Sequence, residues 1–219
     1  MLKSRLVDGE KVDRRLARLA RLGLSPNAWT GLALAVALGG FVALWRGQLL
    51  PGLLLFLVSG GLDVVDGAVA RATGRTSVAG AFLDGVLDRY VEALLILGLL
   101  FYIGPEAEFI IPMSGWIAAL IFGAVMTSFV RAYADHRGLV KDQAVLAKEM
   151  GGLLERAERL ILIYAGMIGA LLFGESWLFG AIAIAAVLSN LTAVQRICIA
   201  MKYAGGVQPR ADKKRKRTV

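Results

Sequence analysis

Apolar segments about 20 residues long recur along this chain of 219 residues, 57% of which are hydrophobic. A helix of that length crosses a bilayer core of about 30 Å. The alternating pattern of a membrane β-barrel is not visible. The sequence therefore predicts an all-α polytopic membrane protein with six transmembrane helices, over residues 28–47, 50–71, 79–103, 111–134, 152–173 and 176–202.

The formal net charge is +8, and the basic residues gather at the ends of the apolar segments. This placement indicates contact with an anionic membrane surface and gives no reason to expect a nucleic-acid partner. Basic residues precede the first span, follow the second and fourth spans, and fill the tail. By the positive-inside rule, both termini are expected on the cytoplasmic side. The single cysteine, Cys198, excludes an internal disulfide framework.

Three regions follow from this pattern. Within residues 1–26 leucines alternate with arginines, which predicts a cytoplasmic, amphipathic juxtamembrane helix that lies on the membrane surface. The alternative is that this segment is a simple basic anchor. Residues 27–203 hold the six spans, and residues 204–219 form a basic cytoplasmic tail.

Four aspartates interrupt the apolar pattern near the cytoplasmic ends of the second and third spans. Asp63 and Asp66 are three residues apart, and Asp84 and Asp88 are four apart, so each pair shares a helix face. The connection "TGRTSV" is short, which predicts antiparallel helices that bring the two pairs together. Four carboxylates would be neutralised by two divalent cations, and all-oxygen ligation favours Mg²⁺ or Mn²⁺.

Membrane carboxylates also serve other purposes. They form proton or cation pathways in transporters, and some pair with arginine only to stay buried. Asp88 beside Arg89, or Asp66 near Arg71, are candidates for such pairs. Four acids interspersed with glycines in one arrangement favour a metal site over these alternatives.

The aspartates belong to a longer motif. It reads Asp63-x-x-Asp66-Gly67-x-x-Ala70-Arg71, then eight residues, Gly80, three residues, Asp84, three residues and Asp88. This pattern resembles the full signature of the CDP-alcohol phosphotransferase family. The layout of six spans is also similar to that family, so the resemblance covers nearly the whole chain.

The resemblance implies transfer of a lipid-phosphate group from a CDP-activated lipid to an alcohol, with release of CMP. It implies that Asp63, Asp66 and Asp84 bind two divalent ions, and that Asp88 completes the metal site and acts as general base. It also suggests a homodimer. The residues implied to bind the CDP-lipid are Asp63, Asp66, Gly67, Ala70, Arg71 and Gly80 of the motif, with Pro26 and Thr30 from "LSPNAWTGL".

Four arginines outside the motif are candidates for binding a phosphate on the acceptor: Arg131, Arg156, Arg159 and Arg196. Arg196 is the most informative, because an arginine within an apolar span needs an anionic partner. The alternatives are that Glu155 pairs with Arg159 along the helix, and that Arg131 is only a flanking charge.

Arg131, "ERAERLI" and "VQR" together resemble the phosphatidylinositol-phosphate synthase branch and its archaeal relatives that use CDP-archaeol. Arginine at position 131 departs from the lysine expected in bacterial members. The branch implies inositol 1-phosphate as the acceptor, with the donor lipid CDP-diacylglycerol or CDP-archaeol. Glycerol 3-phosphate is the alternative acceptor, and serine fits the arginines less well. A cation- or proton-coupled transporter is the alternative from a different class.

Overall fold

The computed structural model describes residues 26–74, 77–139 and 150–204. Six helices occupy these ranges, and they match the six predicted segments with ends shifted by a few residues. They are α2 (Pro26–Trp45), α3 (Leu49–Ala72), α4 (Val78–Ile103), α5 (Met113–His136), α7 (Arg156–Phe173) and α8 (Ser176–Ala204). Two short antiparallel strands, β1 (Glu108–Phe109) and β2 (Ile111–Pro112), connect α4 to α5. The predicted amphipathic segment and basic tail lie outside the described residues, apart from the ends of α2 and α8.

Four of the helices are long and apolar enough to cross a membrane. They carry the candidate spans Ala28–Trp45 (α2), Leu49–Arg71 (α3), Met113–His136 (α5) and Ser176–Ala204 (α8). The helices α4 and α7 are interrupted by charge: α4 contains two acids and an arginine between positions 88 and 92, and α7 opens with Arg156, Glu158 and Arg159. Their crossing of the membrane therefore stays a prediction.

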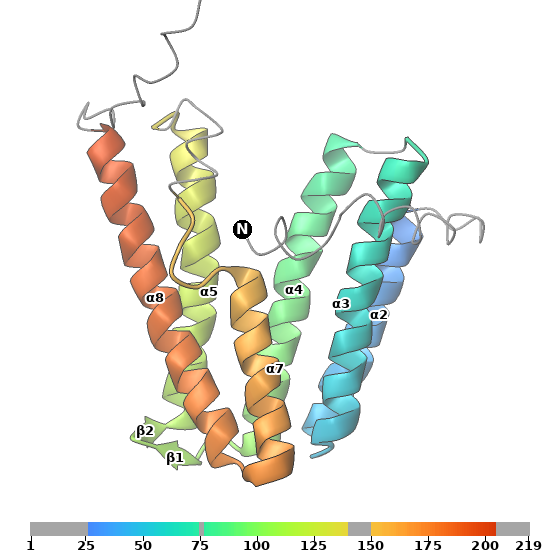
Figure 1. Cartoon of the computed structure of the whole chain (residues 1–219), viewed down its shortest axis with the longest axis vertical. Coiled ribbons are helices and arrows are strands. Elements are labelled where there is room, and N and C mark those ends of the chain that lie inside the picture. Colours follow the sequence, from blue (N-terminus) through green and yellow to red (C-terminus); the bar gives the residue numbers. More distant parts are fainter. Residues whose placement is uncertain (1–25, 75–76, 140–149, 205–219) are drawn as a thin grey trace, which may run out of the picture.

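The helices form two groups that lean together. In one group α2 packs against α3 and α4, and in the other α5 and α7 pack against α8. Contacts between α4 and α5, and between α3 and α7, join the groups. Figure 1 shows the end of α3, the start of α4 and the ends of α5 and α8 at one end of the bundle, with β1 and β2 at the other. As predicted, α3 and α4 run in opposite directions (Figure 1), but each packs mainly on α2 and they make few contacts with each other.

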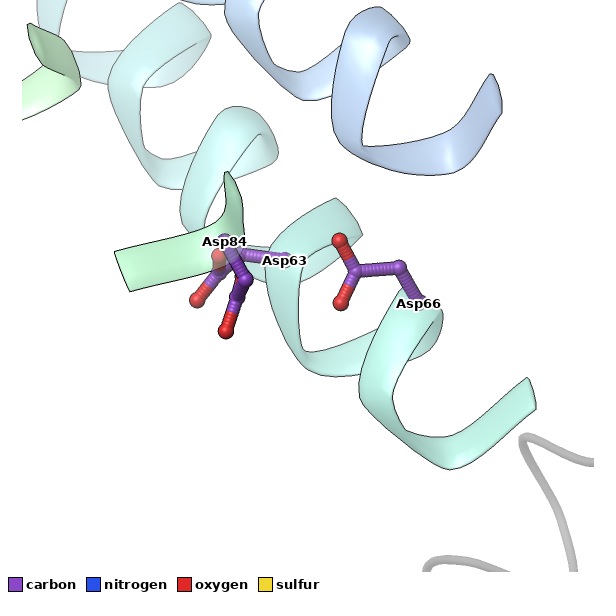
Figure 2. Close-up of side chains that lie close together, drawn as sticks. All are labelled: Asp63, Asp66 and Asp84. Carbon is purple, nitrogen blue, oxygen red and sulfur yellow. The ribbon is translucent and has the colours of Figure 1, made fainter. Parts of the chain in front are cut away.

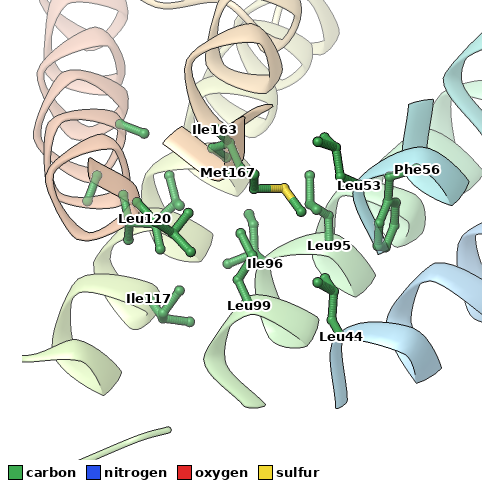
Figure 3. Close-up of a cluster of buried hydrophobic side chains, with 14 of the residues drawn as sticks. Leu44, Leu53, Phe56, Leu95, Ile96, Leu99, Ile117, Leu120, Ile163 and Met167 are labelled. Atoms are coloured by element: carbon green, nitrogen blue, oxygen red, sulfur yellow. The ribbon is translucent and has the colours of Figure 1, made fainter. Parts of the chain in front are cut away.

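The apolar core lies between these two ends. Phe56, Leu95, Leu99 and Met167 are buried together there, from α3, α4 and α7 (Figure 3). Membrane helices gain little from the hydrophobic effect, so close approach at small residues holds them together. The apolar core thus holds the helices together in the middle of the bundle, and the polar end, which lies outside this core, can hold a site.

Candidate active site

Three aspartates from α3 and α4 converge at the polar end of the bundle. Asp63 and Asp66 come from α3 and Asp84 comes from α4, and one carboxylate oxygen of each lies within 4.8 Å of the others. Figure 2 shows the three side chains pointing toward one another. Asp66 is 6% exposed, whereas Asp63 and Asp84 are half-buried. The predicted convergence of the two helices is therefore observed for these three acids.

This donor set fits a divalent cation. It consists of three carboxylates from two helices, with no nitrogen or sulfur ligand among them. Hard cations such as Mg²⁺ and Mn²⁺ prefer oxygen ligands of this kind. Like charges brought so close repel one another unless a cation or protons intervene. We therefore regard Asp63, Asp66 and Asp84 as residues able to hold a divalent ion.

Thr30 of α2 fixes the orientation of the most buried of these acids. Its hydroxyl Oγ1 donates a 2.7 Å hydrogen bond to Asp66 Oδ2, and both side chains are buried. A hydrogen bond to a charged acceptor contributes about 1.5–3 kcal/mol. The sequence placed Thr30 near the nucleotide, and the structure adds that it contacts the aspartate triad directly.

Replacing Thr30 by valine should lower kcat/KM for the CDP-lipid by roughly tenfold, because the isosteric side chain leaves Asp66 without its donor. Ser59→Ala is the matched control. Its hydroxyl is also buried between α2 and α3 and lines the same small cavity, but it donates to the carbonyl oxygen of Ala33, at 2.8 Å, and not to an aspartate. Steady-state kinetics of both variants would check this. Equal losses in the two would mean that Thr30 acts only through packing of α2 on α3.

Asp88 does not join the triad but forms an ion pair with Arg156 of α7. Its Oδ2 contacts Arg156 Nη1, and its backbone carbonyl accepts from Arg156 Nη2 at 3.4 Å. The predicted alternative partner, Arg89, instead bonds to Glu92. Asp88 nonetheless lines a small cavity together with Asp63, Thr30 and Arg156. The fourth aspartate of the motif is therefore adjacent to the triad and already in contact with one of the predicted acceptor arginines.

The remaining motif residues lie along the same helices. A Cβ on Gly67 would lie 3.2 Å from Arg71 Nη1, so the Arg71 side chain folds back across this glycine. The backbone N–H of Gly80 is bound by Ser77 Oγ at 3.0 Å, which caps α4. Ala70 is half-buried on α3. Gly67 thus leaves room for the Arg71 side chain, and Ser77 caps the start of α4. Pro26 is the first residue of α2, and its side chain is outside the described part.

A second, larger cavity of about 820 Å³ lies between α4, α5, α7 and α8, and Arg156, the partner of Asp88, lines both cavities. Two carboxylate residues, Asp135 and Glu155, line it. Its arginines outnumber these acids: Arg89, Arg131, Arg156, Arg159 and Arg196. All four arginines predicted for the acceptor therefore meet in one cavity. The excess of positive charge suits an anionic ligand.

Arg196 and Arg159 are the most buried of these arginines, at 6% and 1% exposure. Arg196 donates from Nη1 to the carbonyl oxygen of Thr127 at 2.5 Å, and its Nη2 lies 3.9 Å from Glu155 Oε1. Its buried Nε has no hydrogen-bond partner within the described residues, and neither does Nε of Arg156. A buried donor without an acceptor is costly, so these groups are suited to receive an anionic ligand.

Arg159 does not pair with Glu155, the partner considered from sequence. Its Nε donates to Glu92 Oε1 at 2.6 Å, in an ion pair that is almost fully buried. Glu155 is instead the N-cap of α7, where it forms a reciprocal capping box with Glu158. The sequence reasoning did not single out Glu92, and it named Arg89 only as a possible partner of Asp88. Spacing was the available signal, because Glu92 is four residues from Asp88 and three from Arg89, and residues at these spacings share a helix face.

Comparison with known proteins places this geometry in context. The family model of the CDP-alcohol phosphatidyltransferases matches residues 24–201. The archaetidylinositol phosphate synthase of Methanothermobacter thermautotrophicus is 33% identical over 177 residues, which cover 81% of this chain and 83% of that protein. The family match spans nearly the whole bundle, the aspartates and the arginine cavity included.

Solved structures also resemble this chain over most of its length. The phosphatidylinositol phosphate synthase of Mycobacterium tuberculosis with CDP-DAG bound superimposes with a TM-score of 0.74 at 27% identity, over 92% of this chain and 99% of that one. A structure of the same synthase in complex with manganese and citrate gives a TM-score of 0.73 at 28% identity, over 91% and 93%. The likeness therefore extends to proteins seen with a CDP-linked lipid and with a divalent metal.

Proposed function

Because this chain belongs to the CDP-alcohol phosphatidyltransferase family, and is a transferase of phospholipid synthesis, we propose that it moves a lipid-phosphate group from a CDP-activated lipid to inositol 1-phosphate, releasing CMP. The observation that carries the choice of acceptor is the cavity beside Asp88, in which five arginines face two acids. Family membership favours this enzyme over the cation- or proton-coupled transporter that buried acids also suggested.

We assign the donor side of the reaction to the aspartate triad. Asp63, Asp66 and Asp84 would hold two divalent ions, Mg²⁺ or Mn²⁺, with Asp88 nearby. When bound, such ions neutralise charge on the pyrophosphate of the CDP-lipid. Gly67, Ala70, Arg71, Gly80, Pro26 and Thr30 would line the CDP-lipid site, as the family signature implies. The manganese complex of the related synthase supports a divalent metal here.

On the acceptor side, a hydroxyl of inositol 1-phosphate would attack the phosphorus that carries the lipid. A new P–O bond forms to the acceptor, the P–O bond to CMP breaks, and the hydroxyl proton passes to Asp88. Asp88 is paired with Arg156 through Oδ2, so a proton could be accepted on that oxygen only after the pair opens. A phosphate on the acceptor offers Arg156 a replacement partner, and this would couple acceptor binding to the freeing of the base.

The acceptor is tested by comparing inositol 1-phosphate with glycerol 3-phosphate, free inositol and serine. Purified protein in detergent, supplied with CDP-lipid and Mg²⁺ or Mn²⁺, should release CMP fastest with inositol 1-phosphate and poorly with the two acceptors that lack phosphate. Preference for glycerol 3-phosphate would assign the protein to phosphatidylglycerophosphate synthesis instead. Preference for serine would contradict the proposal that the arginine cavity binds a phosphate on the acceptor.

Arg196→Gln should raise the KM for inositol 1-phosphate roughly 10- to 100-fold, because charge-assisted hydrogen bonds contribute about 1.5–3 kcal/mol. The KM for the CDP-lipid should change little, since Arg196 lies in the large cavity and not among the aspartates. Arg46→Gln, which removes an exposed arginine just after α2 ends and outside the large cavity, is the control. An unchanged acceptor KM in the Arg196 variant would place the acceptor phosphate elsewhere.

The remaining assignments concern the setting of the site. We propose that α4 and α7 also cross the membrane, that residues 27–203 form one catalytic domain, and that the site and both termini face the cytoplasm. The family match over residues 24–201 supports the single domain. The basic residues at the polar end of the bundle support the orientation. The homodimer stays a prediction from the resemblance.

A further inference from the structure

Glu92 is a buried acid of α4 that neither the motif nor the reaction described above uses. It lies four residues beyond Asp88 and is 3% exposed. Each of its carboxylate oxygens binds a different arginine. Oε1 accepts from Arg159 Nε at 2.6 Å, and Oε2 accepts from Arg89 Nη1 at 3.2 Å. Both arginines line the large cavity, whereas Glu92 itself does not.

The two arginines come from different helices. Arg89 belongs to α4 and Arg159 to α7. Glu92 of α4 therefore links these two helices through its ion pair with Arg159, and both helices line the cavity. A second helix contact supports Arg159, because its Nη1 lies 3.5 Å from Ser189 Oγ on α8. These contacts use Nε and Nη1 of Arg159, so the N–H groups of Nη2 remain available to a ligand in the cavity. An arginine fork is useful for phosphate only when its plane is fixed in this way.

Two ion pairs connect α4 to α7, one helical turn apart. Asp88 pairs with Arg156, and one turn further Glu92 pairs with Arg159. The Asp88–Arg156 pair involves the proposed general base, which would change partners during the reaction. The Glu92–Arg159 pair is buried and contains no reacting group, so it can hold α4 and α7 together while the Asp88–Arg156 pair opens.

We propose that Glu92 is a positioning residue for the acceptor pocket. It holds Arg159 and Arg89 so that their free N–H groups face the phosphate of the acceptor. This inference rests on the proposed function, because it assumes that the cavity receives a phosphorylated alcohol. Glu92 touches neither substrate, so its effect is transmitted through the two arginines.

The variants Glu92→Gln and Glu92→Asp separate positioning from packing. Glutamine offers one oxygen and one N–H₂ group, so one of the two arginines faces a donor and must turn away. We expect the acceptor KM to rise about tenfold or more, with the KM for the CDP-lipid within about twofold of wild type. Aspartate keeps both oxygens and the charge but withdraws them by one methylene. It should restore part of the acceptor affinity.

Asn190→Ala is the matched control for lost buried hydrogen bonds. The Asn190 amide donates to the carbonyl oxygens of Ala119 on α5 and Ala186 on α8, so its hydrogen bonds involve none of the cavity's arginines. This variant should lose thermal stability without any change in the ratio of the two KM values. If Glu92→Gln behaves like it, with lower stability and an unchanged acceptor KM, the positioning role is overturned. Tighter acceptor binding in Glu92→Gln would also overturn it, because Glu92 would then act only as a counter-charge.

Binding of inorganic phosphate distinguishes failure of this inference from failure of the proposed function. Calorimetry on the full-length protein in detergent should give a weaker phosphate Kd for Glu92→Gln than for wild type. If wild type releases no CMP with any phosphorylated alcohol, the proposed function fails, and this Kd comparison still decides the role of Glu92. If Glu92→Gln does not fold, Glu92→Asp takes its place. A phosphate Kd equal to that of wild type, or no phosphate binding by wild type, contradicts the inference.

Discussion

Asp63→Asn is expected to lower kcat/KM by about 10³-fold, the equivalent of roughly 4 kcal/mol of transition-state stabilisation. Asp63 belongs both to the aspartate triad and to the small cavity shared with Asp88. Asparagine has nearly the same shape, but it replaces a charged oxygen with an N–H₂ group that cannot bind a cation. The variant should also need a much higher concentration of Mg²⁺ or Mn²⁺ for half-maximal activity.

The measurement is a metal titration of CMP release for wild type and variant. Glu108→Gln is the control, because it removes a carboxylate from β1 at the opposite end of the molecule. It should leave both the rate and the metal dependence unchanged. If Asp63→Asn keeps more than about a tenth of wild-type activity with the same metal dependence, the triad is not the metal site.

Asp88→Asn is expected to reduce kcat by about 10²- to 10⁴-fold, the usual contribution of a general base. Binding of the CDP-lipid should remain largely intact, because the carboxylates of the triad are unchanged. Single-turnover CMP release measures the chemical step, and calorimetry with the CDP-lipid measures binding.

Asp88 also pairs with Arg156, so losing that ion pair must be separated from losing the base. Arg156→Gln removes the pair but keeps the carboxylate. At saturating acceptor it should retain much more kcat than Asp88→Asn, with its main defect in the acceptor KM. Equal kcat losses in the two variants would show that the ion pair, and not a base, is what Asp88 contributes.

Much of the donor half of the site could be predicted from sequence because its determinants are local. Asp63 and Asp66 share a face by helical spacing, and the short connection brings Asp84 of the next helix beside them. Helix positions followed in the same way from apolar segments of membrane length. The start of α7 differed, because Glu155 and Glu158 form a capping box that sets the first turn at Arg156.

The pairing of the arginines could not be predicted, because it depends on contacts between distant parts of the chain. Arg159 and Glu92 are 67 residues apart, and Arg156 and Asp88 are 68 apart. Sequence spacing offered Glu155 and Arg89 as alternative local partners. In the fold Glu155 caps α7 and lies 3.9 Å from Arg196, and Arg89 binds Glu92. Partner choice among buried charges follows helix packing, which spacing along one helix does not reveal.

Mass spectrometry of the lipid product is the most direct test of the transfer. Purified protein would receive CDP-lipid, a divalent metal, and inositol 1-phosphate carrying a heavy-oxygen label on its hydroxyls. The account predicts a lipid that retains the acceptor phosphate and the labelled bridging oxygen, formed together with unlabelled CMP. CMP released equally without acceptor, or a product lipid lacking the acceptor phosphate, would contradict it.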